Sequence, residues 1–166
     1  NNTDWNITVI DKLTYASMGF KRLNDTIFQN AIKEKKLKLI TWDLAVPFSI
    51  GLTKELGDIN IIVHMAAETH VDNSIKTPVP FVKNNIMSTL HLLEYSRKLN
   101  NLETFFYFST DEVYGSLNAT NQFNEQSKYA PRSPYSASKD SSDHLVMAWF
   151  HTYGFPGLIS NCSNNY

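Results

Sequence analysis

A group of reactive side chains follows directly after a short, strongly apolar run. Residues 105–108 are four aromatic residues in a row, which indicates a buried strand, and the polar residues Ser109, Thr110, Asp111 and Glu112 follow it directly. Open α/β sheets bind their ligands at the carboxyl ends of their strands. A hydroxyl and two carboxylates placed there could hold a polar substrate and move protons to and from it. The simpler interpretation is that the Asp-Glu pair caps a turn.

A tyrosine and a lysine stand further along the chain with helical spacing. Tyr135 and Lys139 are four residues apart, so they share one face of a helix near its start. A tyrosine with its ordinary pKa of about 10 is a poor base at neutral pH. A nearby ammonium and the positive end of a helix both stabilise the phenolate, which makes Tyr135 a candidate base. Alone this pair is a weak signal, because chance and surface packing produce many such pairs, but the upstream Thr110, Asp111 and Glu112 strengthen it.

The elements that must position these residues follow an α/β pattern. Strands are expected at 6–11, 37–42, 105–108 and 155–160, and a further strand with its exit loop at 60–70. Helices are expected at about 22–35, 47–56, 79–99 and 135–153, and the polar stretch 117–134 should form a loop over the site. Two sets of apolar residues should face the core from the long helices: Phe81, Ile86, Leu90, Leu93 and Leu99 on the first, and Leu145, Val146, Trp149 and Tyr153 on the second.

Three short motifs carry a family resemblance. They are Ser-Thr-Asp-Glu-Val-Tyr-Gly at 109–115, Pro-Tyr-Ser-Ala-Ser-Lys at 134–139 and Asn-Cys-Ser-Asn-Asn-Tyr at 161–166. A Thr at a strand end followed by Tyr-x-x-x-Lys resembles the catalytic set of the short-chain dehydrogenase/reductases. The longer motifs resemble the nucleoside-diphosphate-glucose 4,6-dehydratases of the extended branch, whose best-known members act on dTDP-glucose. The resemblance implies a Rossmann-type doubly wound parallel sheet, bound NAD and a homodimer paired through long helices such as 79–99.

The resemblance also implies a reaction, the dehydration of dTDP- or UDP-glucose to a 4-keto-6-deoxy sugar nucleotide. Tyr135 would take the proton of the sugar 4-hydroxyl while Thr110 bonds that oxygen and Lys139 assists, as hydride passes from C4 to NAD⁺. Glu112 would remove the C5 proton, and a protonated Asp111 would release the 6-hydroxyl as water before hydride returns to C6. Adjacent carboxylates in a partly dry cleft need not share one protonation state, which suits these two roles.

Matching the chain to the family gives a set of expected ligand contacts. The cofactor contacts are Asp11, Lys12, Leu13, Thr14, Asp43, Leu44, Met65, Ala66, Ala67, Asn84, Tyr135, Lys139 and Asn165, and the substrate contacts are Thr69, Thr110 and Asn164. Asp11 would accept hydrogen bonds from the adenosine ribose hydroxyls. Without the resemblance, Asp11 is better interpreted as a turn or cap aspartate, and Asp43 as the cap of the following helix.

The glycine-rich phosphate loop of such folds is expected about 20 residues before the ribose-binding acid. Ten residues precede Asp11 here, and none is glycine. We therefore expect residues 1–166 to be a truncated NAD-binding domain that lacks the first strand and its loop, with most of the sugar-nucleotide domain absent. On its own this piece should bind NAD poorly and be inactive.

Composition narrows the partners. The net charge of −1 provides no basic surface for nucleic acid, and no apolar run approaches the ~18 residues of a membrane span. The single cysteine, Cys162, excludes an internal disulfide and fits a reducing, cytoplasmic compartment. His64 and His70 have no third ligand nearby, so no metal site is expected. His64 should be a hydrogen-bonded core residue, and His70 should shape a loop.

Two alternatives remain open at this stage. A nucleotide-sugar 4-epimerase or another extended reductase would share Thr110, Tyr135 and Lys139 but would not need the two carboxylates. A non-catalytic nucleotide-binding module would explain the absent glycine loop but not the combination of Thr, Tyr and Lys. Loss of water or inversion at C4 separates the two enzymes.

Overall fold

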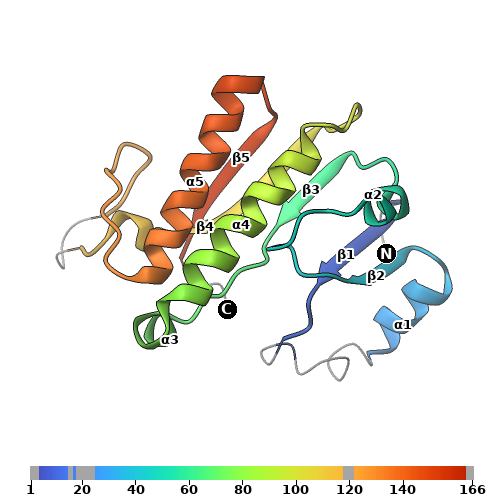
Figure 1. Ribbon diagram of the computed structural model, residues 1–166, viewed down its shortest axis with the longest axis horizontal. Helices are drawn as coiled ribbons and strands as arrows, with labels where there is room; N and C mark the ends of the chain where they lie inside the picture. The colour runs from blue at the N-terminus through green and yellow to red at the C-terminus, as the bar shows by residue number, and fades with distance from the viewer. Residues whose placement is uncertain (1–3, 15–16, 18–24, 118–121, 164–166) are drawn as a thin grey trace. The chain divides into compact units, whose positions relative to one another are not determined.

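The computed structural model describes residues 4–14, 17, 25–117 and 122–163. The chain divides into two compact units, 1–44 and 45–166, and each is described by itself. Within the described residues, no helix is both long and apolar enough to cross a bilayer. Both units combine parallel strands with helices, so the expected α/β class with parallel sheets is confirmed (Figure 1).

The first unit holds a two-stranded parallel sheet and one helix. Strand β1 (Ile7–Asp11) pairs with β2 (Leu37–Thr41), and the register sets Asp11 opposite Thr41 at the carboxyl ends. Helix α1 (Thr26–Lys33) begins where Asp25 accepts a hydrogen bond from the backbone N–H of Ile27 at 2.6 Å. The helix is shorter than the expected 22–35, whose residues 22–24 lie outside the described part of the chain.

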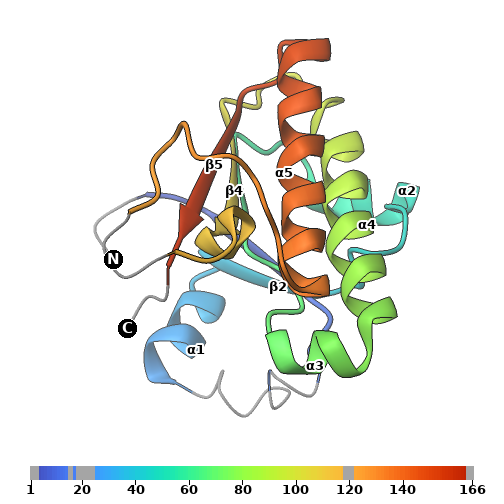
Figure 2. The same ribbon diagram turned by 90° about the vertical axis from the view of Figure 1, so that its left-hand side faces the viewer.

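The second unit is a three-stranded parallel sheet in the order β3 (Ile61–His64), β4 (Thr104–Thr110) and β5 (Gly157–Cys162). Its helices are α2 (Ile50–Leu56), α3 (Val71–Lys76), α4 (Pro78–Ser96) and α5 (Pro134–Tyr153), and a 3₁₀ turn, η3 (Asp111–Tyr114), follows β4 directly. The long helices α4 and α5 lie side by side along the same face of this sheet (Figures 1 and 2).

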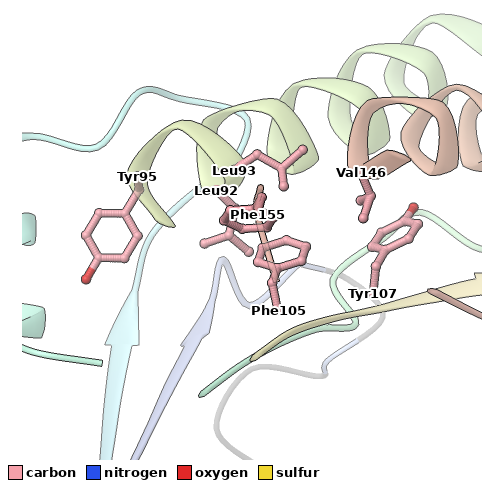
Figure 3. Packing of buried hydrophobic residues seen from close by; sticks show 7 residues of the cluster. All are labelled: Leu92, Leu93, Tyr95, Phe105, Tyr107, Val146 and Phe155. Atoms are coloured by element: carbon pink, nitrogen blue, oxygen red, sulfur yellow. The ribbon is translucent and has the colours of Figure 1, made fainter. Parts of the chain in front are cut away.

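The core of the second unit lies between β4 and the two long helices. Seven residues form it: Leu92, Leu93, Tyr95, Phe105, Tyr107, Val146 and Phe155 (Figure 3). Only alternate aromatic residues of β4 are fully buried there, because successive side chains of a strand point to opposite faces. Phe105 and Tyr107 face the helices, whereas Phe106 and Phe108 are half-buried and contact each other with ring centroids 4.7 Å apart.

The faces of the long helices differ from the expected apolar stripes. Phe81 and Leu93 of α4 and Val146 of α5 are buried as predicted, but Tyr153 is 52% exposed and the other predicted core positions are only partly buried. Small polar side chains fill the buried face instead: Asn85, Ser88 and Thr89 on α4, and Ser136, Ser138, Ser142 and Asp143 on α5. The hydroxyls of Ser88, Thr89 and Ser142 bond backbone carbonyls of the preceding turn, which offsets the cost of burying them.

Several boundaries and one element also differ from expectation. Residues 71–76, where no helix was expected, form α3, and α2 begins at Ile50 because the Ser49 hydroxyl accepts from the Leu52 N–H at 3.1 Å. Helix α5 begins with Pro134 in its first turn and a capping box between Ser133 and Ser136, and Gly154 ends it in the left-handed conformation. Strand β5 starts two residues later than predicted, at Gly157, directly after Pro156, which has no N–H to donate to the sheet.

Candidate active site

The end of β4 forms a tight polar turn. Thr110 is the N-cap of η3, and its hydroxyl accepts from the Glu112 N–H at 3.3 Å. The same hydroxyl donates to the Asp111 carboxylate at 3.4 Å. The turn also explains why Gly115 follows: it has a φ of +89°, and an added Cβ would lie 2.6 Å from the carbonyl oxygen of Ala130. This close approach, with the Ala130 N–H donating to the Val113 carbonyl at 2.8 Å, anchors the end of the polar loop beside η3.

Tyr135 lies at the start of α5 and faces this turn. Its backbone N–H donates to the Ser74 hydroxyl at 3.2 Å, so the short helix α3 anchors the beginning of α5. Three residues at the end of β4 and the start of η3 act on its phenol: Thr110 by a side-chain hydrogen bond, and Glu112 and Asp111 by their charges. The structure therefore brings Thr110, Asp111, Glu112 and Tyr135 together, whereas in sequence they span 25 positions from Thr110 to Tyr135.

The electrostatics of these groups have clear directions. Burial raises the pKa of Tyr135, and the charges of Glu112 and Asp111 raise it further, while the hydrogen bond from Thr110 opposes them. The phenol thus holds its proton more firmly than an ordinary tyrosine. Burial, followed by the charge of Asp111, raises the pKa of Glu112 as well. A carboxylate with a raised pKa is a stronger base than an ordinary one.

Lys139 lies one turn beyond Tyr135 and is 3% exposed. Its ammonium donates to the Phe108 carbonyl at 2.5 Å and lies 4.2 Å from the centroid of the Tyr107 ring. Burial lowers the pKa of Lys139 to about 8, against the opposing charge of Asp143. The lysine is therefore held between the strand and its own helix.

Asp143, one further turn along α5, is fully buried and did not emerge from the sequence. Its carboxylate accepts from the Ser109 hydroxyl at 2.9 Å and from the Asn161 amide at 3.1 Å. Burial raises the pKa of Asp143 to about 6, although those hydrogen bonds and the charge of Lys139 oppose the rise. The signal that could have revealed it is its spacing, because an acid four residues after Lys139 lies on the same face of the helix as that lysine.

The loop after β3 carries several of the expected cofactor contacts. Met65 and Ala66 are exposed, Ala67 is half-buried, and Thr69 is exposed. Asn84 donates to the Glu68 carboxylate at 3.2 Å and so lies beside the same loop.

Asn85 holds that loop in place and is a residue whose role the sequence did not reveal. Its side chain accepts from the Glu68 N–H at 2.7 Å, and donates to the Glu68 carbonyl at 3.0 Å and to the Ser138 hydroxyl at 2.8 Å. One buried amide thus connects the β3 loop, α4 and α5. Chain position gives no sign of this, because Asn84 and Asn85 are equally polar neighbours.

The two histidines at the end of β3 and in its exit loop, His64 and His70, have different surroundings. His64 is 2% exposed, and its Nε2 lies 3.1 Å from the Thr89 hydroxyl, so its role as a hydrogen-bonded core residue is confirmed. His70 is the N-cap position of α3 rather than part of a longer loop. Within the described residues, no three potential ligands of a metal ion come together.

In the first unit, the expected adenosine contacts gather at the carboxyl ends of β1 and β2. The Asp11 carboxylate accepts from the Leu13 N–H at 2.6 Å, so it also forms the turn expected in the simpler interpretation. Leu13 has a φ of 51°, and the Lys12 ammonium lies 3.8 Å from the Asp43 carboxylate.

The other expected contacts of this part are placed as follows. Thr14 accepts two hydrogen bonds from Ser17 through its carbonyl, and Leu44 is buried. Asn164 and Asn165 lie outside the described residues. Which of the site residues touch cofactor or substrate stays a prediction.

The sequence matches known proteins over its full length. Residues 3–166 match the family described as GDP-mannose 4,6 dehydratase. The chain is 42% identical over 189 aligned residues to dTDP-glucose 4,6-dehydratase of Escherichia coli, covering 100% of this chain and 49% of that protein. It is 50% identical over 114 residues to the enzyme of the same name from Neisseria meningitidis serogroup B, covering 63% of this chain and 32% of the relative. The chain thus spans about half the length of the first relative.

Solved structures with the same fold include a dehydratase and an epimerase. The dTDP-glucose 4,6-dehydratase DesIV from Streptomyces venezuelae, solved with NAD and TYD bound, superposes with a TM-score of 0.84 at 34% identity, over 99% of this chain and 48% of that one. UDP-glucuronic acid 4-epimerase from Bacillus cereus in complex with NAD gives a TM-score of 0.82 at 28% identity, over 99% and 50%. The expected Rossmann-type fold is confirmed by these similarities. The chain therefore belongs to the GDP-mannose 4,6-dehydratase family, as a dTDP-glucose 4,6-dehydratase-like member of the extended short-chain dehydrogenase/reductases.

Proposed function

We propose that the protein containing this chain catalyses the NAD-dependent dehydration of dTDP- or UDP-glucose to the 4-keto-6-deoxy sugar nucleotide. The observation that carries the proposal is the approach of Asp111 and Glu112 to the Tyr135 phenol, beside the Thr110 hydroxyl. A 4-epimerase needs a hydroxyl, a phenol and an ammonium, but elimination of water also needs an acid and a second base. The identity to dTDP-glucose 4,6-dehydratases supports the same choice.

The residues present suit a flat ring and the ribose hydroxyls of NAD. The exposed backbone at Ala66 carries only a methyl side chain, so a flat ring can approach it closely. The Lys139 ammonium has three protons, and the hydrogen bond to Phe108 uses one of them, which leaves donors for ribose hydroxyls. In the other unit, the exposed Asp11 carboxylate suits the ribose hydroxyls of NAD and disfavours the 2′-phosphate of NADP. When bound, NAD⁺ would accept hydride from the sugar C4 and return it to C6.

The first step assigned to this chain is removal of the 4-hydroxyl proton. Thr110 would hydrogen-bond the sugar oxygen, and Tyr135 as phenolate would take its proton while C4 is oxidised to the ketone. Burial and the two carboxylates hold the pKa of Tyr135 above its ordinary value, so the phenolate must form at the expense of these interactions. We assign Lys139, one helical turn away, the task of keeping positive charge near that phenolate.

The second step is elimination across C5 and C6. The 4-ketone acidifies the C5 proton because the carbanion is delocalised as an enolate, and Glu112 takes that proton. Asp111, in its protonated form, gives a proton to the departing 6-hydroxyl, so that the C6–O bond breaks with release of water. Once C6 has been reduced, Glu112 returns a proton to C5, and the product differs from the substrate by one water.

The product formed in D₂O tests the proposal directly. The protein encoded by the complete gene is incubated with NAD⁺ and, in turn, dTDP-glucose and UDP-glucose, and the products are analysed by mass spectrometry and NMR. A product lighter by one water that carries deuterium at C5 is expected with one of these sugars. An epimer of unchanged mass would establish the 4-epimerase instead, and binding without turnover would establish the non-catalytic module.

Two single substitutions test the acid and base assignments. Asp111→Asn should slow elimination by about 10²-fold or more while leaving C4 oxidation within about tenfold, since it removes only the proton donor to the leaving group. Glu112→Gln should suppress deuterium incorporation at C5. Glu125→Gln, which removes the same charge from an exposed position of the polar loop, is the matched control and should leave both steps unchanged. Equal loss of oxidation and elimination in Asp111→Asn contradicts the acid role.

Two further features of the whole protein remain predictions. Pairing of subunits through α4 would make it a homodimer, and the reducing compartment suggested by Cys162 would make it cytoplasmic. Sedimentation of the complete protein decides the first, and cell fractionation decides the second.

A further inference from the structure

Asp143 is a fully buried acid that no step of the proposed reaction uses. It is 0% exposed, yet it lies on the same helix as Tyr135 and one turn beyond Lys139. Its carboxylate accepts hydrogen bonds from Ser109, the residue before Thr110 on β4, and from Asn161 on β5. Burying an ionised acid costs free energy unless hydrogen bonds or an opposite charge compensate it, so the partners of this carboxylate show what its charge does.

The surroundings of the carboxylate contain one cation. The titratable groups that face Asp143 are Lys139 on α5, Tyr107 on β4, Tyr114 on η3 and Tyr129 from the polar loop. Of these only Lys139 carries positive charge, and within the described residues no carboxylate lies within salt-bridge distance of its ammonium. The ammonium itself also faces His64 on β3 and lies over the Tyr107 ring. Asp143 and Lys139 therefore form a buried pair of opposite charges that interact across one helical turn without direct contact.

We propose that Asp143 is a positioning residue that keeps Lys139 charged and fixes the catalytic helix against the ends of β4 and β5. The catalytic part of this inference rests on the proposed function, because Lys139 is there assigned to the Tyr135 phenolate. The mechanical part follows from the two hydrogen bonds, which tie α5 to Ser109 and Asn161.

The physical reason is the balance of burial and charge. Burial alone would drive Lys139 toward its neutral form, and a nearby anion restores the ammonium. The Ser109 hydroxyl and the Asn161 amide, which donate to the carboxylate, keep that anion ionised in turn. With the pKa of Asp143 raised to about 6 and that of Lys139 lowered to about 8, both groups are charged between about pH 6 and pH 8.

The direct test is the titration of Lys139 in the complete protein. Lysine labelled with ¹³C at Cε reports the ammonium by NMR, and the signal is assigned by its loss in Lys139→Met. In Asp143→Asn, which keeps the shape of the side chain, the Lys139 midpoint should move below about 8 by about one pH unit. Asp140→Asn, which removes the charge paired with His144 on the same helix, should leave the midpoint in place. An unchanged midpoint in Asp143→Asn overturns the proposal.

The pH profile of kcat separates this role from a merely structural one. A midpoint lowered by one unit reduces the charged fraction of Lys139 at pH 8 from about one half to about one tenth, so kcat at pH 8 should fall about fivefold. At pH 6 the loss should be less than twofold, because Lys139 is charged in both proteins and Asp143 is itself half protonated. A loss of equal size at every pH refutes the electrostatic role.

A second variant keeps the proposal testable if Asp143→Asn does not fold. Ser109→Ala leaves the carboxylate in place but removes one donor, which should raise the pKa of Asp143. The Lys139 midpoint should then fall, as in Asp143→Asn but by a smaller amount. No movement in this variant also overturns the proposal. The NMR titration can be read whether or not the protein dehydrates a sugar, so failure of the proposed function and failure of this inference remain distinguishable.

Discussion

Acidification should destabilise the second unit through a single buried histidine, His64. The imidazole is 2% exposed, lies against the Tyr107 ring with centroids 5.2 Å apart, and bonds Thr89. Burial, followed by the charge of Lys139, lowers the pKa of His64 from 6.5 to about 3. Below pH 6.5 the unfolded chain takes up a proton at this position and the folded chain does not, so stability is lost as the pH falls toward 3.

The size of the effect follows from the difference between the two pKa values. Each pH unit between them corresponds to about 1.4 kcal/mol, so lowering the pH from 6.5 to 4.5 should reduce the free energy of unfolding by about 3 kcal/mol. Urea unfolding of the complete protein, followed by circular dichroism at pH 7 and pH 4.5, measures this loss. Carboxylates add their own pH dependence, so the quantity to compare is the difference between the protein and its variants.

His64→Gln supplies the decisive comparison. The amide can still bond Thr89 but does not titrate, so this variant should be less stable at pH 7 and should lose about 3 kcal/mol less on acidification. His151→Gln, at an exposed position near the end of α5, should retain the full wild-type loss. If His64→Gln loses as much stability between pH 7 and 4.5 as the unsubstituted protein, the imidazole is not held neutral by burial and the reasoning is wrong.

Two further pairs of substitutions test the site geometry. Gly115→Ala places a Cβ 2.6 Å from the Ala130 carbonyl at a positive φ, so it should lower kcat and cost about 2 kcal/mol or more of stability, whereas Gly154→Ala, also at positive φ but with nothing within 4 Å, should cost about 1 kcal/mol and leave kcat unchanged. Denaturant unfolding and product assays measure both, and equal effects would contradict the close approach. Asn85→Ala should cost about 2–3 kcal/mol in the same unfolding measurement because it leaves the half-buried N–H and carbonyl of Glu68 without this partner. Asn84→Ala should cost less than about 1 kcal/mol, and the reverse order would contradict the role of Asn85 in holding the β3 loop.

Local chemistry made most of the elements predictable. The aromatic run of β4, the proline at the start of α5 and the glycine after it are short-range signals, and each marks its element in the structure. Helix α3 escaped prediction because its six residues, Val71–Lys76, contain too few apolar positions for a helical period to be visible.

The faces of the long helices could not be predicted for a different reason. The periodicity argument assumes that the buried face is apolar, but here Asn85, Ser138 and Ser142 bond one another and the backbone across the contact between α4 and α5. Whether a serine is buried depends on the hydrogen-bond partners that the opposite helix provides, and those are known only from the packed structure. The same limit hid Asp143, whose donors Ser109 and Asn161 lie 34 and 18 residues away in the chain.

The division of the chain into two compact units has an evolutionary consequence. Every side chain assigned to proton transfer lies in the second unit, whereas Asp11, which suits an unphosphorylated ribose, lies in the first. Mutations that alter the preference between NAD and NADP can therefore accumulate around β1 without passing through the hydrogen bonds that orient Tyr135 and Lys139. If Asp11 is the residue that distinguishes the two dinucleotides, selection on the presence of the 2′-phosphate acts on a stretch of the gene apart from the one that encodes the proposed proton-transfer residues.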